Sequence, residues 1–423
     1  MELWRKNLYI LWGTQFLAMV GMNLVVPFLP FYVRQLGVTD PSEIARWSGL
    51  VFAGPFISAF LAIPFWGNLG DRYGRKIMVV RAIFGLALSQ VLIGFAQDVT
   101  QLFVFRIFQG AISGFIASAL ALVSTNTPKD KIGYAMGVLQ SSSAAGMVLG
   151  PLVGGVLADL IGYREIFLIT AFLCIVGGVA VVTKVTEVSR VALDSRTYTV
   201  RQNYSFMLSN KQLRLVAITL VVGQASVLMI EPIFAIFIES FTPDTRFIST
   251  LAGSIFSIAG LFMIISAPWW GKRNDRKGYK KNLCFAMAAT GVSYAGHLLV
   301  VDLFQLGALR ALLGFARGGA LPTLYSLTNI YAPPDRRGGI IAIASSLTIL
   351  GNMIGPVIGG FVAGQFGITA TFMVNSVMLV TMSVVLWRLL DESPHQDSQL
   401  SITRVETETS LMQSTGPKTP QTP

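Results

Sequence analysis

Charged residues are scarce in this sequence. Only 13% of the 423 residues are Asp, Glu, Lys or Arg, whereas 53% are hydrophobic, which is far from the balance of an ordinary soluble domain. The apolar residues fall in many runs of about 20, each long enough to cross about 30 Å of hydrocarbon as a helix. The composition therefore predicts a protein that spans a membrane several times.

The sequence also lacks the motifs of several enzyme classes. It contains no G-x-x-x-x-G-K-[ST] phosphate loop, and no polar segment is long enough for a nucleotide-binding domain. The only two cysteines, Cys174 and Cys284, lie inside apolar runs without the spacing of metal ligands. We therefore expect no enzymatic activity, no cofactor and no metal, and we expect any transport to be driven by an ion gradient.

Apolar windows between charged and turn-forming residues predict twelve membrane-spanning helices. They cover residues 7–33, 47–66, 77–97, 101–123, 134–158, 164–183, 214–238, 249–270, 282–300, 303–327, 338–362 and 368–390. The polar segment 184–213 separates two groups of six, so the predicted domains are an amino-terminal bundle over 1–183 and a carboxy-terminal bundle over 214–390, joined by a linker. The tail 391–423 is rich in Ser, Thr, Gln and Pro, and we expect it to be disordered.

The net charge of +11 comes largely from basic residues in short segments between the predicted helices. Most of them fall on one side if the amino terminus is cytoplasmic, as the positive-inside rule requires. This asymmetry predicts an inner-membrane protein with both termini and the tail in the cytoplasm. It also indicates the lipid bilayer, and not nucleic acid, as the partner of the basic residues, and we expect a monomer.

Three landmarks recur in the two halves. The segment from Gly67 to Lys76, with an Asp-Arg pair, is repeated from Gly271 to Lys280, with Asp275 and Arg276. Arg106 in the predicted fourth helix has a partner at Arg310, at the same distance from the first glycine of its segment. Glycines around the Gly-Pro pair of the fifth helix recur at nearly the same offset in the eleventh. Internal repeats of membrane helices are typical of transporters in which two related bundles move around a central site.

These residues resemble the major facilitator superfamily, and within it the twelve-span drug:proton antiporters. The family signature G-x-L-x-D-R-x-G-R-K is matched by Gly67, Leu69, Asp71, Arg72, Gly74, Arg75 and Lys76, with Gly70 between them, and the antiporter pattern of the fifth helix by Gly146, Gly150, Pro151, Gly154 and Gly155. The resemblance implies an all-α fold of two pseudo-symmetric six-helix bundles and efflux of drugs or other amphipathic molecules in exchange for protons. It also implies a conformational gate in which Asp71 docks at the start of the eleventh helix, near Gly338 and Gly339.

Charges inside the membrane are expensive and are therefore candidates for function. Glu231 precedes Pro232 in the seventh predicted helix, where the proline predicts a helix break. It is our candidate proton carrier, with a structural or topological role as the alternative. Arg106 matches an arginine that the resemblance implicates in proton coupling, with a structural contact as the alternative. Arg310 is interpreted as structural. The candidates for the substrate cavity are Asn23, Gln15, Gln109, Arg317 and Phe234, and Arg317 could instead pair with Glu231.

Three other functions stay open, and one of them is not transport: a membrane sensor that uses the tail 391–423 for signalling. The same scaffold would export a dedicated metabolite such as a siderophore, with Arg317 or Arg106 meeting its carboxylates. Uptake by proton symport is disfavoured by the Gly150-Pro151 pair. Helix 1 also carries Asn23 where several resembling antiporters place an acidic residue, which speaks against coupling through two carboxylates.

Overall fold

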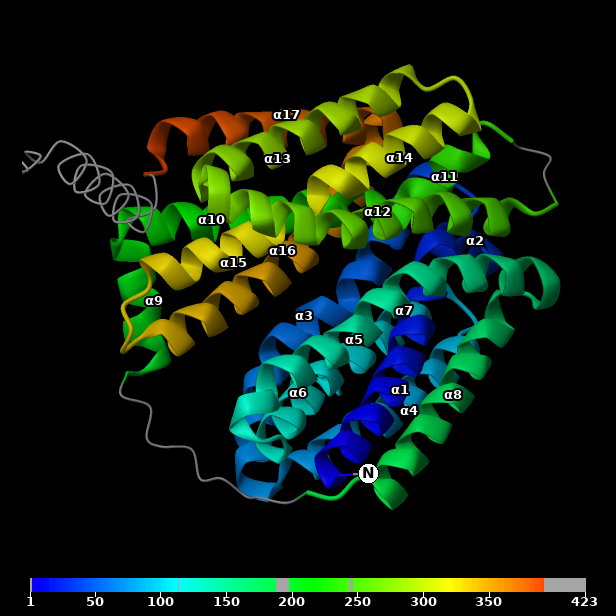
Figure 1. Cartoon of the computed structure of the whole chain (residues 1–423). Coiled ribbons are helices and arrows are strands. Elements are labelled where there is room, and N and C mark those ends of the chain that lie inside the picture. The colour runs from blue at the N-terminus through cyan, green and yellow to red at the C-terminus, as the bar shows by residue number, and fades with distance from the viewer. Residues whose placement is uncertain (1, 113, 188–197, 243–245, 392–423) are drawn as a thin grey trace, which may run out of the picture.

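The computed structural model describes residues 2–112, 114–187, 198–242 and 246–391 (Figure 1). Within these ranges all regular structure is helical. Apart from one short helix between the two halves, the helices line up as twelve rods, each a single helix or consecutive helical segments. The first six are α1 (Leu3–Asn23) with η1 (Val26–Phe28) and α2 (Leu29–Gln35), α3 (Pro41–Tyr73), α4 (Arg75–Gly94), α5 (Val99–Ala111) with α6 (Phe115–Asn126), α7 (Ile132–Ile161) after η2 (Lys129–Lys131), and α8 (Tyr163–Lys184). They form the amino-terminal bundle.

The carboxy-terminal bundle repeats this order. Its rods are α10 (Lys211–Ile230) with η3 (Glu231–Ile233) and α11 (Phe234–Glu239), α12 (Ile248–Lys277), α13 (Tyr279–Gly296) with η4 (His297–Leu299), α14 (Leu303–Arg317) with α15 (Ala320–Tyr331), α16 (Arg337–Phe366), and α17 (Ile368–Leu389). Helix starts keep the offset of the sequence repeat, since α4 and α13 begin at equivalent positions and so do α7 and α16. The structure therefore confirms the predicted pseudo-symmetry.

Ten of the rods in the described residues have the length and hydropathy of a membrane span. The other two are α13 with η4, and α14 with α15. They are the repeat partners of α4 and of α5 with α6, and they complete the predicted twelve. The predicted linker 184–213 contains the short helix α9 (Val200–Ser209), the tail 392–423 lies outside the described residues, and the domain boundaries stay predictions.

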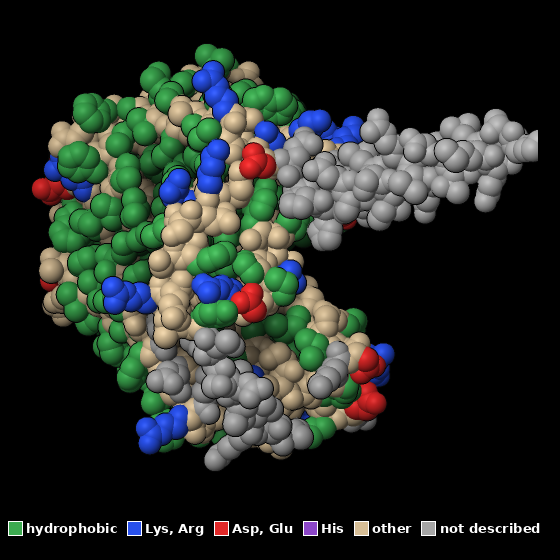
Figure 2. Space-filling view, turned by 90° about the vertical axis from the view of Figure 1, so that its left-hand side faces the viewer, with side chains coloured by type: hydrophobic (Ala, Val, Ile, Leu, Met, Phe, Trp, Pro, Cys, Tyr) green, Lys and Arg blue, Asp and Glu red, His purple; other side chains and the backbone are tan. Residues whose placement is uncertain are grey.

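The two bundles meet at one end of the molecule and separate at the other (Figure 1). They meet around α2, α11 and the neighbouring ends of α7 and α12, which we call the closed end. The opposite end carries the start of α1, α9 and the end of α17, and we call it the open end. Seen from the open end, the surface is hollowed between the bundles (Figure 2).

Candidate functional site

A break in the seventh rod positions Glu231. Helix α10 ends at Ile230, the short turn η3 holds Glu231 and Pro232, and α11 begins at Phe234. Proline lacks a backbone N–H and cannot continue the hydrogen-bond ladder of a helix. The first rod breaks in the same way at η1, where Pro27 takes the place that Pro232 has in η3. The break puts the carboxylate of Glu231 inside the carboxy-terminal bundle.

Glu231 lies beside Arg317 at the end of α14. The Nη2 of Arg317 donates to Oε1 of Glu231 over 3.4 Å, and both side chains are only 15% exposed. The contact is longer than the roughly 2.7–2.9 Å that is usual for a charge-assisted hydrogen bond. In the structure, Arg317 therefore makes the contact of its alternative interpretation, an ion pair with Glu231.

Arg310 lies in the same region of the bundle, fully buried at 2% exposure. Its guanidinium stacks over the rings of Phe234, at 4.1 Å, and Phe256, at 5.2 Å. Phe234 itself is only 1% exposed, so in this conformation it packs beneath Arg310 and does not face an open cavity. His297 stacks on Phe372 nearby and donates its Nδ1–H to the Ser293 carbonyl over 2.7 Å.

The candidates in the amino-terminal bundle make local contacts. Arg106 is 8% exposed, and its Nη1 donates to Gln109 Oε1 over 3.2 Å. Gln15 is fully buried and donates to the Leu139 carbonyl and to Ser143 Oγ. Asn23 donates back to the Met19 carbonyl of its own helix. The structure therefore brings Arg106 and Gln109 together, and it describes no contact between Arg106 and Glu231.

The glycines of α7 serve two different contacts. Gly146, Gly150 and Gly154 lie against α1 of the same bundle, where added Cβ atoms would overlap Met19, Asn23 and Leu24. Gly155 and Pro151 face α12 of the other bundle, because a Cβ on Gly155 would overlap the Ser249 carbonyl and a Cβ on Gly253 would overlap the Pro151 carbonyl. The repeat places Gly49 of α3 against Pro356 of α16 in the same manner. Glycine contacts thus join the bundles at two helix pairs, α7 with α12 and α3 with α16.

The signature segment 67–76, which the predicted spans 47–66 and 77–97 leave as a loop between two helices, is largely helical in the structure. Asp71 and Arg72 belong to the last turn of α3, α4 begins at Arg75, and Gly74 between them has φ +108°. Asp275 and Arg276 likewise lie in α12, followed by Gly278 with φ +87°. The polar residues of this segment ended the predicted membrane span. An α-helix can nevertheless continue beyond the membrane surface into water, as long as its backbone N–H and C=O groups stay hydrogen-bonded. Each signature is therefore a helical corner closed by a glycine with positive φ.

Contacts within the first corner hold it to its own bundle. Glu187 accepts hydrogen bonds from the backbone N–H groups of Arg75 and Lys76, over 2.9 and 3.2 Å, and so caps α4. The Arg75 side chain donates to the Ala121 carbonyl, and Lys76 to that of Val182. Asp275 accepts from the Tyr279 hydroxyl in the second corner.

The predicted docking of Asp71 on the eleventh rod stays a prediction. The side chain of Asp71 lies outside the described residues. At the start of α16, Gly339 lies against the Asn203 amide of α9. Gly67 and Gly70 belong to α3.

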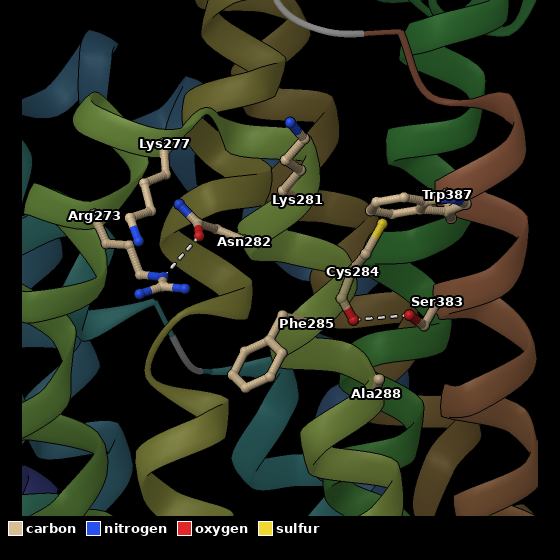
Figure 3. Close-up of a pocket in the computed structure, with 9 residues that line it drawn as sticks. All are labelled: Arg273, Lys277, Lys281, Asn282, Cys284, Phe285, Ala288, Ser383 and Trp387. Atoms are coloured by element: carbon tan, nitrogen blue, oxygen red, sulfur yellow. Dashed lines mark hydrogen bonds between the residues drawn. The ribbon is translucent and has the colours of Figure 1, made fainter.

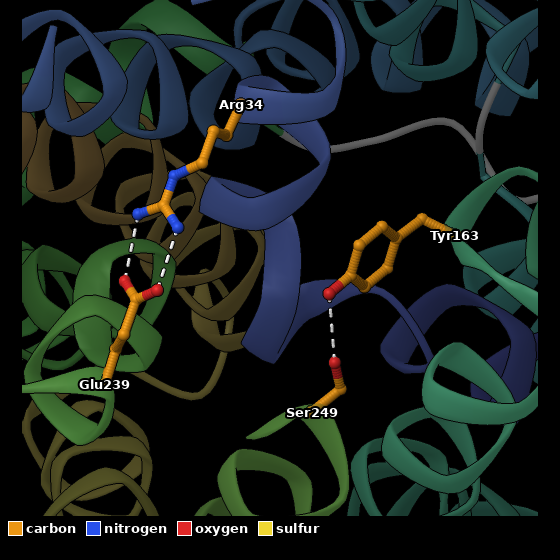
Figure 4. A network of polar contacts seen from close by, with 4 residues as sticks. All are labelled: Arg34, Tyr163, Glu239 and Ser249. Atoms are coloured by element: carbon orange, nitrogen blue, oxygen red, sulfur yellow. Dashed lines mark hydrogen bonds and ion pairs between the residues drawn. The ribbon is translucent and has the colours of Figure 1, made fainter. Parts of the chain in front are cut away.

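A set of polar contacts at the closed end was missed by the sequence analysis. Arg34 of α2 makes a bidentate ion pair with Glu239 of α11, over 2.8 and 2.9 Å, and the hydroxyls of Tyr163 and Ser249 lie 3.0 Å apart (Figure 4). Asp159, near the end of α7, accepts from the Ser249 and Thr250 backbone N–H groups and from the Thr250 hydroxyl. The Asp159 carboxylate of the amino-terminal bundle therefore caps the first turn of α12 in the carboxy-terminal bundle. The only signal in the sequence was the position of these charges between predicted spans.

Comparison with known proteins decides the family. The profile of the Major Facilitator Superfamily matches residues 11–248 and 220–414. The chain belongs to the major facilitator superfamily. This membership confirms the predicted resemblance and the twelve-rod fold.

Relatives within the major facilitator superfamily extend over nearly the whole chain. Multidrug resistance protein MdtG of Proteus mirabilis is 34% identical over 384 residues, which are 91% of this chain and 96% of that protein. The protein of the same name from Enterobacter lignolyticus is 36% identical over 377 residues, which are 89% and 90%.

Solved transporters of similar shape agree with this fold. The nucleoside transporter NupG has a TM-score of 0.77 at 14% identity, covering 90% of this chain and 98% of that one. A bacterial homolog of the human lysosomal transporter Spinster, inward-facing and occupied, has the same score and identity, covering 92% and 98%. At this identity the likeness shows the fold alone.

The chain is therefore a multi-pass membrane protein and a secondary transporter of a small molecule. The roles of single residues in the major facilitator scaffold stay predictions.

Proposed function

We propose that this protein exports drugs or other amphipathic small molecules in exchange for protons. The observation that carries the proposal is the Glu231–Arg317 pair at 3.4 Å, set at a helix break inside the bundle. The name multidrug resistance protein, borne by relatives at 34% and 36% identity, supports the substrate class. We further propose a monomer in a bacterial inner membrane with both termini cytoplasmic, so that the open end faces the cytoplasm.

Exchange follows from competition for one carboxylate. A cation such as Arg317 or a cationic drug favours the ionised form of Glu231, whereas the apolar surroundings favour the protonated form. In the state that is open to the cytoplasm, Glu231 releases its proton and substrate binds. After the closed end opens and the open end closes, a proton from outside neutralises Glu231 and substrate leaves. The glycine contacts of Gly155 and Gly253 would separate during that step.

A second candidate function is export of a metabolite that carries an acidic group. It is favoured by the sign of the buried charges, since Arg310 and Arg317 surround a single carboxylate in the carboxy-terminal bundle and Arg106 adds a cation in the other. A carboxylate or phosphonate on the substrate would meet Arg317 when Glu231 takes up a proton. Such a substrate would still be exchanged for protons.

Transport into inside-out vesicles tests the proposal. We expect a drug added to wild-type vesicles to enter and to dissipate an imposed proton gradient, and we expect Glu231→Gln to reduce this exchange by at least about tenfold. The matched control is Glu165→Gln, the same loss of charge at an exposed position in the first turn of α8. Unchanged exchange in Glu231→Gln would refute the proton role. A panel containing cationic and acidic compounds distinguishes the two substrate classes.

A further inference from the structure

A second cavity lies away from the space between the bundles. It has a volume of about 430 Å³ and sits at the open end of the carboxy-terminal bundle, between α12, α13 and α17 (Figure 3). The lining residues are Arg273, Lys277, Lys281, Asn282, Cys284, Phe285, Ala288, Ser383 and Trp387. In Figure 3 the lysines and Trp387 lie in its upper part, and Phe285 and Ala288 lie in its lower part. We call this cavity the peripheral groove.

Two cations of the peripheral groove lack acidic partners. Arg273 and Lys277 follow each other by one turn on α12, and neither forms an ion pair with any carboxylate in the described residues. Arg273 is held in place, because its Nε–H donates to Asn282 Oδ1 over 3.0 Å and its guanidinium lies 5.0 Å from the Trp269 ring. Two neighbouring cations without a counter-charge favour an anion as the ligand.

Asn282 points to the same ligand chemistry. The residue is only 2% exposed, its Oδ1 is used by Arg273, and its Nδ2 has no acceptor in the described structure. A buried donor without an acceptor is unfavourable. In Figure 3 this nitrogen is turned to the side on which Lys277 lies. An oxyanion beside Arg273 and Lys277 would accept its hydrogen bond.

The lower part of the peripheral groove is apolar. Phe285 and Ala288 of α13 line it, and Trp387 of α17 lies higher, at the level of Lys281 (Figure 3). Phe285 and Trp387 are 57% and 56% exposed. The Ser383 hydroxyl does not add polarity, because it donates to the Cys284 carbonyl over 2.7 Å. The lining from Lys281 to Ala288 runs about 10 Å along the helix axis. This surface suits a hydrocarbon chain.

The fold itself does not require these polar residues. At the equivalent positions of the repeat, the amino-terminal bundle has Leu69, Tyr73, Ile77 and Met78 in place of Arg273, Lys277, Lys281 and Asn282. The same helical corner thus forms without these charges. They are a property of one bundle only.

We propose that the peripheral groove binds one anionic phospholipid. Its phosphate lies between Arg273, Lys277 and the Asn282 amide, and an acyl chain runs along Phe285 and Ala288. Basic pockets between membrane helices are typical sites for acidic lipid headgroups, and the aromatic ring of Trp387 suits the membrane interface. A free phosphate would use the cations alone and leave the apolar lining without a partner. The proposal does not depend on the substrate or on proton exchange.

Native mass spectrometry of the full-length protein in detergent tests the site. Cardiolipin, phosphatidylglycerol and phosphatidylethanolamine with the same acyl chains are titrated separately. We expect wild type to bind one cardiolipin or phosphatidylglycerol at least tenfold more tightly than phosphatidylethanolamine, and R273Q/K277Q to lose this preference. N282M, which carries the residue of the other bundle, should weaken binding severalfold and keeps both cations.

A control separates the site from general charge. K211Q/R214Q removes two exposed cations from α10 at the same open end, and it should leave the preference unchanged. Equal loss in both double variants would overturn the proposal, as would equal binding of phosphatidylethanolamine. Displacement of the lipid by millimolar inorganic phosphate would identify a free-anion site instead. Should R273Q/K277Q not yield folded protein, K277Q alone, at an exposed side chain, gives the same comparison with K211Q.

Discussion

Arg310 keeps a positive charge inside the carboxy-terminal bundle by means of aromatic faces. Its guanidinium lies 4.1 Å from the ring of Phe234 and 5.2 Å from that of Phe256, and among the described residues it forms no ion pair. A desolvated cation over a ring gains about 2 kcal/mol. This contact supports the interpretation of Arg310 as structural, and it gives Phe234 a packing role in this conformation.

Phe234→Leu should therefore lower the thermal stability by more than the loss of buried apolar area alone would. Phe115 of α6 is buried to 6% exposure, without a described ring or cation partner, so Phe115→Leu removes similar area alone. We expect the apparent Tm in detergent to fall several degrees further in Phe234→Leu than in Phe115→Leu. Equal shifts would show that the cation contributes little.

At the scale of elements, breaks in four rods set the positions of the candidate residues. The rods are interrupted at η1, between α5 and α6, at η3, and between α14 and α15. Glu231 lies in one break and Arg317 at the edge of another, so the ion pair joins two broken rods. Broken helices are where transporters expose polar groups at membrane depth.

The sequence predicted the rods and the break at Pro232, because a proline interrupts a helical hydrogen-bond ladder, but the other breaks were not predicted, for a physical reason. Hydropathy reports how favourable a segment is in lipid, and the apolar window around Pro27 stays favourable when the ladder is interrupted. Hydropathy also misplaced the ends of α3 and α12, because polar residues end an apolar window but do not end a helix. These two helices extend in water through Arg72 and Arg276. The repeat was predictable because its spacing is visible in the sequence itself. Contacts between bundles, such as that of Asp159 with α12, depend on tertiary arrangement and left no periodic signal.

The glycine contact between α7 and α12 gives a prediction at this scale. A Cβ at position 253 would overlap the Pro151 carbonyl, whereas one at position 271 of the same helix meets nothing within 4 Å. Gly253→Ala should therefore push the bundles apart at the closed end and reduce transport at least about fivefold. Gly271→Ala is the control and should transport like wild type. If both variants transport normally, close approach at Gly253 is not needed for the cycle.

At the scale of the whole molecule, the polar contacts that join the bundles at the closed end differ in strength. The Arg34–Glu239 pair is bidentate but 45% and 27% exposed, and exposed pairs contribute only about 0–1 kcal/mol. Asp159 is half-buried and accepts from three donors of α12. Charge-assisted bonds to backbone N–H groups are roughly twice as strong as neutral ones. Such contacts suit an end that must open in each cycle, with Asp159 as the stronger element.

Spin labels at Gln97 and Val301 measure how often the closed end opens. Both are exposed loop residues of the closed end, one in each bundle, and they occupy the same position in the repeat. In a background with the buried Cys174 and Cys284 replaced by Ala, the distance distribution reports the fraction of molecules whose closed end has opened.

Glu239→Gln should raise that fraction by up to about fivefold, the factor that corresponds to about 1 kcal/mol, and Asp159→Asn should raise it further. The exchange Arg34→Glu with Glu239→Arg should restore the wild-type distribution, and Arg246→Gln, at an exposed cation of the same end, should leave it unchanged. A larger effect of Glu239→Gln than of Asp159→Asn would contradict the ranking, and it would make the surface ion pair the main contact that closes this end.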